Sequence, residues 1–151
     1  MSTLAVNKRA HFDYEISDKY EAGLVLLGHE VKSVKTGHIS LKGSFVTIKG
    51  NELYLTNANI PLYLRAGKTP NYDPSRPRKL LLKKSEIKHL IGKARTLGLT
   101  LAPIKIYTKK QLIKLEFGVG KGKKEYDKRE KIKNREDKRK IRQAVKTAIR
   151  G

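Results

Sequence analysis

Cysteine is absent from the sequence, and so are long apolar runs. Without cysteine there is no disulfide framework of the kind that stabilises small secreted folds. The longest apolar runs, such as Leu24–Leu27 and Leu80–Leu82, fall far short of the roughly 20 residues that cross a bilayer. The first ten residues carry two basic side chains but lead into no apolar stretch of signal-peptide length. We therefore expect a cytoplasmic protein that does not enter a membrane.

Acidic residues are scarce relative to basic ones. The chain has 35 Lys and Arg against 14 Asp and Glu, which gives a formal net charge of +21 and a pI near 10.2. A charge of this size repels itself unless a polyanion neutralises it. A membrane surface is one such polyanion, but no segment of the sequence is suited to insert into it. The composition therefore favours nucleic acid as the partner.

The 151 residues suffice for one compact domain with an appendage. The composition changes after Val119, and we place the domain at residues 1–120 and a basic tail at 121–151. The tail has 14 Lys or Arg against five Asp or Glu, and Ile132 is its only aliphatic residue between positions 121 and 140. So little apolar surface cannot offset the entropy lost on ordering. We expect the tail to be disordered when free and helical on a polyanion.

Alternating apolar and polar residues predict several short strands. The predicted strands are a first one from Phe12 to Ile16, a hairpin of 45–48 and 53–55, a strand over Ile60, Leu62 and Leu64, and a second hairpin of 104–107 and 113–119 that turns near Lys109–Lys110. Between them, the proline-containing stretch Ala66–Arg78 is expected to be an exposed loop.

Two segments have helical spacing. Val31 and Val34 predict a short helix over Gly28–Gly37. A second helix is predicted over Glu86–Leu97, started by Ser85 and ended by Gly98. Many short strands with few helices indicate a mainly β fold, and we expect a small OB-like antiparallel β-barrel, closed or nearly closed.

Neither a metal site nor a phosphate-binding loop fits the sequence. The stretch His29-Glu30-Val31-Lys32-Ser33 resembles the zinc-protease pattern but has serine where the second histidine is required. Gly118, Gly120 and Gly122 match no phosphate-binding motif and are interpreted as a hinge before the tail. Clustered carboxylates for metal-assisted cleavage of nucleic acid are also missing. We therefore expect no enzyme activity, metal, cofactor or small-molecule substrate.

Three stretches, in order along the chain, resemble one family. The first stretch comprises Asn7-Lys8-Arg9-Ala10 with Asp13-Tyr14, then Glu21-Ala22-Gly23, then Gly28-His29-Glu30-Val31-Lys32-Ser33. The second is Arg78-Lys79-Leu80-Leu81-Leu82, and the third runs from Gly118 through Lys124 into Tyr126-Asp127-Lys128-Arg129. Together they resemble the SsrA-binding proteins, also called small protein B. Gly43, Lys83 and Gly120 depart from the pattern of that family only mildly.

The resemblance implies an OB-like barrel that binds the tRNA-like domain of transfer-messenger RNA (tmRNA, or SsrA RNA) and delivers it to stalled ribosomes for trans-translation. It also implies a tail that becomes helical on the ribosome, where it probes the decoding centre and the empty mRNA channel. The residues assigned to the RNA-facing surface are Asn7, Lys8, Arg9, Glu21, Glu30, Lys32, Arg76, Arg78, Lys79 and Lys114. The residues assigned to the tail site on the ribosome are Gly122, Lys123, Lys124, Tyr126, Asp127, Lys128, Arg129, Arg135, Arg139 and Arg142. We expect the protein to act as a monomer.

Each assignment has a simpler alternative. A single lysine can be a solvated charge without a specific partner. Glu21 and Glu30 either accept from RNA or orient a neighbouring cation, or they form plain surface pairs with the lysines at positions 19, 32 or 35. Tyr126 either stacks on a base or packs back on the barrel. For the whole protein, a structural ribosomal protein and a nuclease are the alternative classes.

Overall fold

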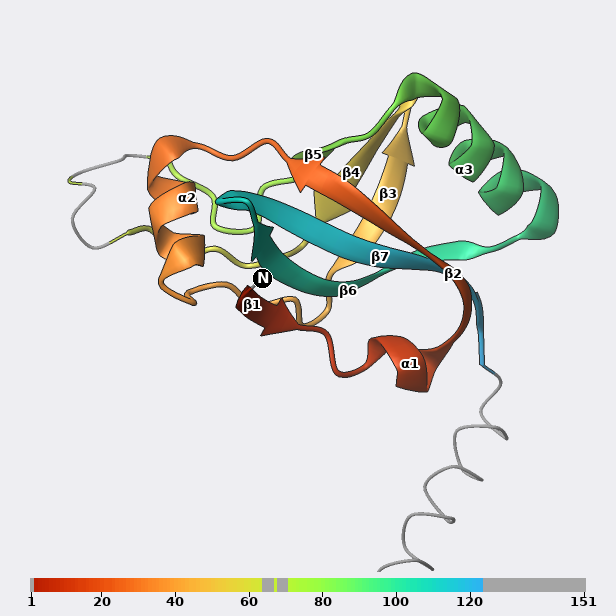
Figure 1. The fold of residues 1–151 in the computed structure, drawn as a ribbon, viewed down its shortest axis with the longest axis horizontal. Helices are drawn as coiled ribbons and strands as arrows, with labels where there is room; N and C mark the ends of the chain where they lie inside the picture. The colour runs from red at the N-terminus through yellow and green to blue at the C-terminus, as the bar shows by residue number, and fades with distance from the viewer. Residues whose placement is uncertain (1, 64–66, 68–70, 124–151) are drawn as a thin grey trace, which may run out of the picture.

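The computed structural model describes residues 2–63, 67 and 71–123, in which one curved antiparallel sheet is surrounded by three helices (Figure 1). The strands are β1 Ser2–Val6, β2 Tyr14–Leu24, β3 Phe45–Lys49, β4 Glu52–Thr56, β5 Arg78–Leu81, β6 Thr100–Lys109 and β7 Leu112–Gly122. The helices are α1 Ala10–Asp13, α2 Gly28–Lys35 and α3 Lys84–Leu97.

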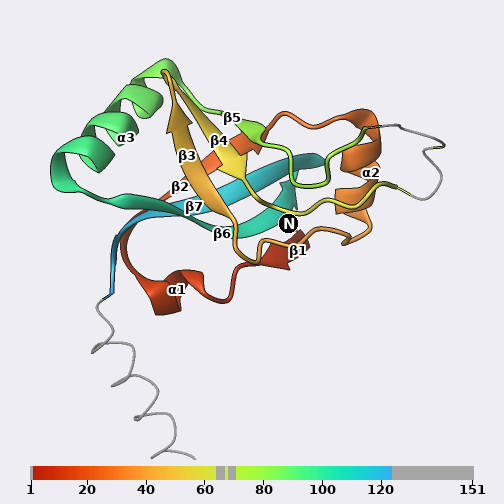
Figure 2. The same cartoon turned by 180° about the vertical axis from the view of Figure 1, so that it is seen from behind.

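The strands lie in the order β1-β6-β7-β2-β5-β4-β3, and each neighbouring pair is antiparallel. The long strands β2, β6 and β7 form the centre of the sheet. β3 curls back toward β6 (Figure 2), but no ladder joins the edge strands β1 and β3 within the described part of the chain. The mainly β, OB-like prediction is therefore confirmed, with a barrel that stays open along one side.

Apolar side chains from the inner face of the sheet form the core. Along β7, Ile113, Leu115 and Phe117 are buried, whereas Lys114 and Glu116 between them are partly exposed. This alternation is what predicted the strand, because successive side chains point to opposite faces of a sheet. Helix α3 adds three buried residues of its own to the same core. Each large apolar side chain that is fully buried stabilises the fold by about 1.5–3 kcal/mol.

The two hairpins and the long helix are confirmed, with small shifts. Lys110 and Gln111 both have positive φ, so the turn between β6 and β7 lies one residue beyond its predicted place. Helix α3 ends at Gly98, which adopts the left-handed conformation as predicted. It begins before Ser85, because the Glu86 carboxylate accepts a hydrogen bond from the Lys83 backbone N–H at 3.4 Å and so caps the helix from Lys83.

Two strand predictions are wrong in part. The segment around Phe12 is the short helix α1, whose backbone N–H groups bond back to the carbonyls of Asn7 and Arg9, so β2 begins only at Tyr14. Ile60 belongs to no ladder, and its backbone N–H bonds to the Pro74 carbonyl at 3.0 Å. Ile60 is apolar because it is buried in the core, and this is why its segment shows the alternating apolar pattern of a strand without pairing as one. Leu64 of that predicted strand lies outside the described residues.

The glycine pair before the tail is not a hinge. Gly118 and Gly120 lie inside β7 and are buried. A Cβ at Gly118 would come within 2.5 Å of Ile16 Cγ2, and a Cβ at Gly120 would come within 2.8 Å of the Glu15 carbonyl oxygen. These glycines are therefore required by the close approach of β2 to β7.

Candidate RNA-binding surface

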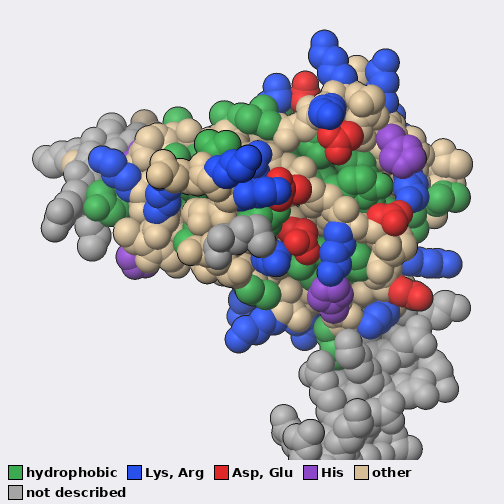
Figure 3. All heavy atoms as spheres, viewed as in Figure 1, with side chains coloured by type: hydrophobic (Ala, Val, Ile, Leu, Met, Phe, Trp, Pro, Cys, Tyr) green, Lys and Arg blue, Asp and Glu red, His purple; other side chains and the backbone are tan. Residues whose placement is uncertain are grey.

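Lysine and arginine side chains are spread over the face of the molecule shown in Figure 3. Several of these exposed cations, among them Lys8, Lys42 and Lys88, form no ion pair with a described residue. Each such charge attracts a phosphate group. Binding is favoured because the contact releases counterions that were condensed on the nucleic acid. The surface is therefore suited to a polyanion over more than one face.

Asn7 shapes the turn between β1 and α1. Its side-chain amide donates to the Pro103 carbonyl at 2.9 Å, and its side-chain oxygen accepts from the Arg9 backbone N–H at 3.3 Å. Both polar ends of the side chain are thereby used within the protein. Arg9 is exposed, lies 4.6 Å from the centre of the Phe12 ring and pairs with Asp13 at 3.2 Å. The structure thus gives Asn7 a positioning role and leaves the cations of this turn on the surface.

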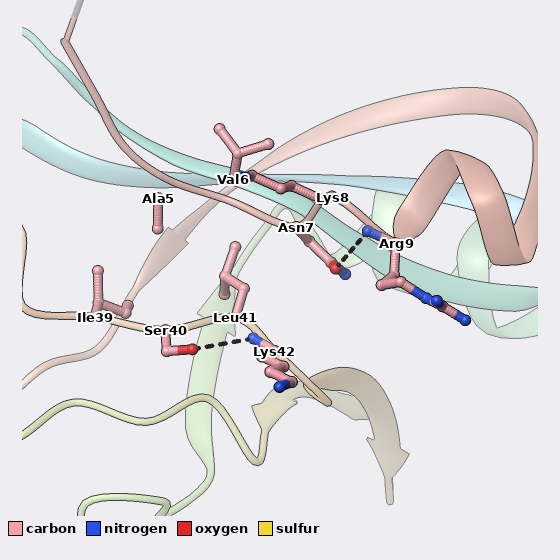
Figure 4. A pocket seen from close by; sticks show the side chains of 9 residues that line it. All are labelled: Ala5, Val6, Asn7, Lys8, Arg9, Ile39, Ser40, Leu41 and Lys42. Carbon is pink, nitrogen blue, oxygen red and sulfur yellow. Dashed lines mark hydrogen bonds between the residues drawn. The ribbon is translucent and has the colours of Figure 1, made fainter. Parts of the chain in front are cut away.

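A pocket of about 320 Å³ lies beside this turn. One wall is the segment from Ala5 to Arg9 and the other is the segment from Ile39 to Lys42, so residues far apart in the sequence meet here (Figure 4). Lys8, Arg9 and Lys42 place three exposed cations around it. Lys42 was not among the predicted surface residues, because nothing in its local sequence shows that it would fold against the N-terminal turn.

The start of the tail is held against α1. The Lys123 backbone N–H donates to the Asp13 carbonyl at 2.9 Å, and the Lys123 ammonium donates to the His11 carbonyl at 2.8 Å. Gly122 is paired with Tyr14 at the end of the β2–β7 ladder. The remaining residues of the predicted tail site, from Lys124 onward, lie outside the described residues.

Glu21 lies on β2 in a small polar group on the outer face of the sheet. The Tyr107 hydroxyl donates to its carboxylate, and the Lys109 ammonium lies 3.5 Å from both carboxylate oxygens. The hydrogen bond from Tyr107 lowers the pKa of Glu21, and the positive charges of Lys109 and Lys114 act in the same direction. Burial and the Glu21 carboxylate together raise the pKa of Tyr107. Glu21 is therefore ionised at neutral pH and holds Tyr107 and Lys109 in place.

Glu30, in contrast, is at the centre of a buried polar cluster. Its carboxylate accepts hydrogen bonds from two guanidinium groups. Arg78 Nε donates to Oε2 at 3.1 Å, and Arg76 Nε donates to the same oxygen at 3.2 Å. It also accepts from the Leu27 backbone N–H at 2.8 Å, and the Tyr72 hydroxyl lies 3.0 Å from Oε2. The cluster ties α2 to β5 and to the segment from Asn71 to Pro77.

Burial by itself raises the pKa of Glu30, but the hydrogen bonds from Arg76, Leu27 and Arg78 outweigh burial and lower the pKa to about 2. The side chains of Glu30 and Arg78 are both 0% exposed, so the prediction that they lie on the RNA-facing surface is wrong. Their charges compensate each other, which is the condition under which ionised groups are found inside a protein. Arg76 is partly exposed and forms the outer edge of the cluster.

The other predicted surface residues are dispersed. Lys32 is exposed on α2 and lies 6.0 Å from the centre of the Tyr63 ring. Lys79 on β5 pairs with Glu52 at 3.6 Å. Lys114 lies on the same outer face as Glu21, because its partner in the ladder is Gly23 on β2. The structure therefore brings Glu21 and Lys114 together, but it separates them from the N-terminal turn and from the Glu30 cluster.

Sequence reasoning missed Tyr72, Tyr107 and Lys109. Tyr107 was assigned only to a strand, and the alternation of that strand predicts its face but not its contact with Glu21 on β2. Tyr72 lies in a proline-containing segment whose path is not predicted by any periodicity. One signal could have found them: an acid that faces RNA must orient a neighbouring hydrogen-bond donor or cation, so Glu21 and Glu30 each required such a partner.

No cluster of three or more His, Asp or Glu residues suited to a metal ion is present within residues 2–63, 67 and 71–123. In the same part of the chain, no helix is long and apolar enough to cross a membrane.

The fold and this surface together define a cationic, OB-like β-sheet protein with charges arranged for a polyanion. The model of the SmpB protein family matches residues 4–147 of the chain. The SsrA-binding protein of Thermosipho africanus is 51% identical over 147 residues, which cover 97% of this chain and 98% of the relative. This chain therefore belongs to the SmpB family.

Other relatives agree. The SsrA-binding protein of Chloroflexus aggregans is 47% identical over 150 residues, which cover 99% of this chain and 95% of the relative. A solved chain described by the words "tmRNA-SmpB: a journey to the center of the bacterial ribosome" is 46% identical, with a TM-score of 0.63. The match covers 80% of this chain and 84% of the solved chain.

Proposed function

We propose that this protein binds the tRNA-like domain of tmRNA and delivers it to stalled ribosomes for trans-translation. The observation that carries the proposal is the family match, which spans both the sheet and the tail. Relatives about half identical over nearly the whole chain are called SsrA-binding proteins, and the matching solved structure concerns tmRNA and SmpB in the bacterial ribosome. The net charge of +21 supplies the physical attraction to RNA.

The outer face around Glu21 is the part of the sheet that we assign to the tRNA-like domain. Glu21 is a positioning residue there: it orients Tyr107 and Lys109, while Lys114 beside it is available to a phosphate. Two ammonium groups in a fixed arrangement, beside the partly exposed Glu21 carboxylate, can recognise the shape of a folded RNA through its phosphates and 2′-hydroxyls. The N-terminal turn, with Lys8 and Arg9, adds a second cationic contact.

In the proposal, the Glu30 cluster does not contact RNA itself but positions other cations. It fixes the segment from Asn71 to Pro77 against α2, and thereby places Lys32 and Arg76. In the proposal, the tail from Gly122 onward becomes helical on the ribosome and probes the decoding centre and the empty mRNA channel. The protein acts as a monomer in the cytoplasm, needs no cofactor and catalyses no reaction.

A binding competition tests this function. Full-length protein is bound to labelled tmRNA, and unlabelled tmRNA or ordinary transfer RNA is added at physiological salt. The proposal expects tmRNA to compete at much lower concentration than transfer RNA. Equal competition by the two RNAs would refute it, because charge alone then explains the binding.

A further inference from the structure

The last residue that the structure describes before the tail, Lys123, is held against the short helix α1. Its backbone N–H donates to the Asp13 carbonyl at 2.9 Å, and its ammonium donates to the His11 carbonyl at 2.8 Å. Carbonyls at the C-terminal end of a helix have no partner inside the helix, so they need donors from elsewhere. Lys123 supplies two such donors. We call the contacts of Lys123 with His11 and Asp13 the α1 clamp.

Steric packing does not fix the end of β7. The β2–β7 ladder ends where Gly122 pairs with Tyr14. A Cβ at Gly122 would meet no described atom within 4 Å, and glycine allows the backbone many directions. The direction in which the chain continues after β7 therefore depends on the two hydrogen bonds of the α1 clamp.

Helix α1 is itself fixed to the sheet. Ala10, its first residue, is buried, and the Ala10 backbone N–H donates to the Asn7 carbonyl at 3.2 Å. Asn7 is bonded to β6 twice. Its backbone N–H donates to the Ile104 carbonyl at 2.7 Å, and its side-chain amide donates to the Pro103 carbonyl at 2.9 Å. A connected set of hydrogen bonds thus runs from Lys123 through α1 to the sheet.

The same helix starts at the cationic N-terminal turn. Lys8 and Arg9 directly precede α1 and are exposed, and Arg9 pairs with Asp13 at 3.2 Å. Figure 1 shows α1 between this turn and the end of β7. Asp13 therefore contacts a cation of the turn through its carboxylate and the root of the tail through its carbonyl.

We propose that Lys123 is a positioning residue that, through the α1 clamp, fixes the direction in which the tail leaves the sheet relative to the N-terminal turn. This inference rests on the proposed function, in which the tail enters the mRNA channel while the sheet holds tmRNA. A clamped tail root has fewer backbone conformations to lose when the tail becomes ordered on the ribosome. Lys123 acts by holding the chain and not by binding a phosphate.

Distance measurements on the free protein test the α1 clamp. Because the chain has no cysteine, Lys88→Cys on α3 and Lys124→Cys beside the clamp give one pair of thiols for nitroxide spin labels. We expect a narrow distribution of distances between the two labels in the full-length protein. Adding Lys123→Met should widen this distribution by roughly twofold or more, because the tail root then samples several backbone conformations. An unchanged distribution overturns the inference.

Two further variants separate the clamp from a general loss of charge. Lys121→Met removes an exposed lysine of β7 that forms no ion pair with a described residue, and it should leave the distribution narrow. Lys123→Arg keeps a side-chain donor for the α1 carbonyls and should also leave it narrow. Equal widening by Lys121→Met and Lys123→Met overturns the inference, because charge and not the clamp would then order the tail root.

Proteins without the labels test the consequence for function. Lys123→Met should lower the rate of trans-translation in a reconstituted system roughly fivefold or more, because the ordering of the tail root then opposes entry into the ribosome. Its affinity for tmRNA should equal that of wild type, and Lys123→Arg should restore the rate. The hydrogen bond that Lys123→Met removes is exposed, so Tm should stay close to that of wild type. A wild-type rate, or a rate lost together with a large fall in Tm, overturns the inference.

The salt dependence of ribosome binding distinguishes holding from phosphate binding. Complexes of tmRNA with wild-type protein or Lys123→Met are titrated with ribosomes over a range of salt, and we expect the same slope for both. A slope smaller by about 0.7–0.9 for Lys123→Met shows a lost phosphate contact and overturns the positioning role. Failure of wild-type protein to prefer tmRNA over transfer RNA is a distinct result. It removes the proposed function, while the distance measurements still decide whether the clamp holds the tail root.

Discussion

Glu30 and the two arginines around it have a direct consequence for stability. Replacing Glu30 by Gln removes the negative charge but leaves the buried Arg78 guanidinium uncompensated. We expect Glu30→Gln to lower the free energy of unfolding by about 3–5 kcal/mol, measured by urea denaturation at pH 7. The matched control is Glu52→Gln, whose partly exposed pair with Lys79 should contribute only about 0–1 kcal/mol. Equal effects of the two changes would contradict the structural role of the cluster.

The same carboxylate gives stability a defined pH dependence. Its pKa is about 2 in the folded protein and about 4.3 in an unfolded chain, so the unfolded state binds more protons as the pH falls. The stabilisation from Glu30 is complete above roughly pH 5 and is lost between about pH 5 and pH 2. The stability difference between wild type and Glu30→Gln should therefore shrink across this range.

For single residues, the sequence identifies which charged side chains are candidates for function, but it does not predict their burial or their contacts. Glu21, Glu30 and Lys114 were all singled out, yet the sequence placed them on one surface. The structure buries Glu30 and keeps Glu21 partly exposed. The side chains that bond to each acid belong to residues more than 40 positions away. Such contacts leave no periodic pattern in the sequence.

Among the secondary-structure elements, β7 depends most on close packing. Gly120→Ala places a Cβ about 2.8 Å from the Glu15 carbonyl oxygen, a backbone atom that cannot move without disturbing the β2–β7 ladder. We expect a loss of about 1–3 kcal/mol in stability by thermal or urea denaturation. Gly122→Ala, in the same strand with nothing within 4 Å, should leave stability unchanged. If the two variants behaved alike, β2 would not approach β7 as described.

Long elements with strong periodicity were predictable, and short ones were not. Helix α3 repeats its pattern over more than ten residues, and its bounds were predicted within two positions. The β6–β7 hairpin was predicted in the right place, but β6 begins four residues before the predicted strand and β7 ends three residues after it. β1 has no alternation, since its residues Ser2–Val6 are exposed or half-buried throughout, so no strand was predicted there. Gly118 and Gly120 looked like a hinge because the approach of a distant strand cannot be seen in a local pattern.

For the whole molecule, the proposed function divides work between the sheet and the tail. Truncating the chain after Lys124 keeps the entire described sheet and the contacts of Lys123 with α1. We expect this variant to bind tmRNA with nearly the wild-type affinity in a filter-binding assay but to lose trans-translation in a reconstituted system. Parallel loss of affinity and activity would contradict the division of labour.

β7 also acts as a spacer of fixed length. Glu116 in its middle is paired with Glu21, and its C-terminal end is held by α1 through Lys123. The ladder with β2 keeps the chain from Glu116 to Gly122 extended. Six steps along an extended strand measure about 20 Å. In the proposed function, the separation between an RNA held at Glu21 and the origin of the tail is therefore set by the sheet before the protein meets a ribosome.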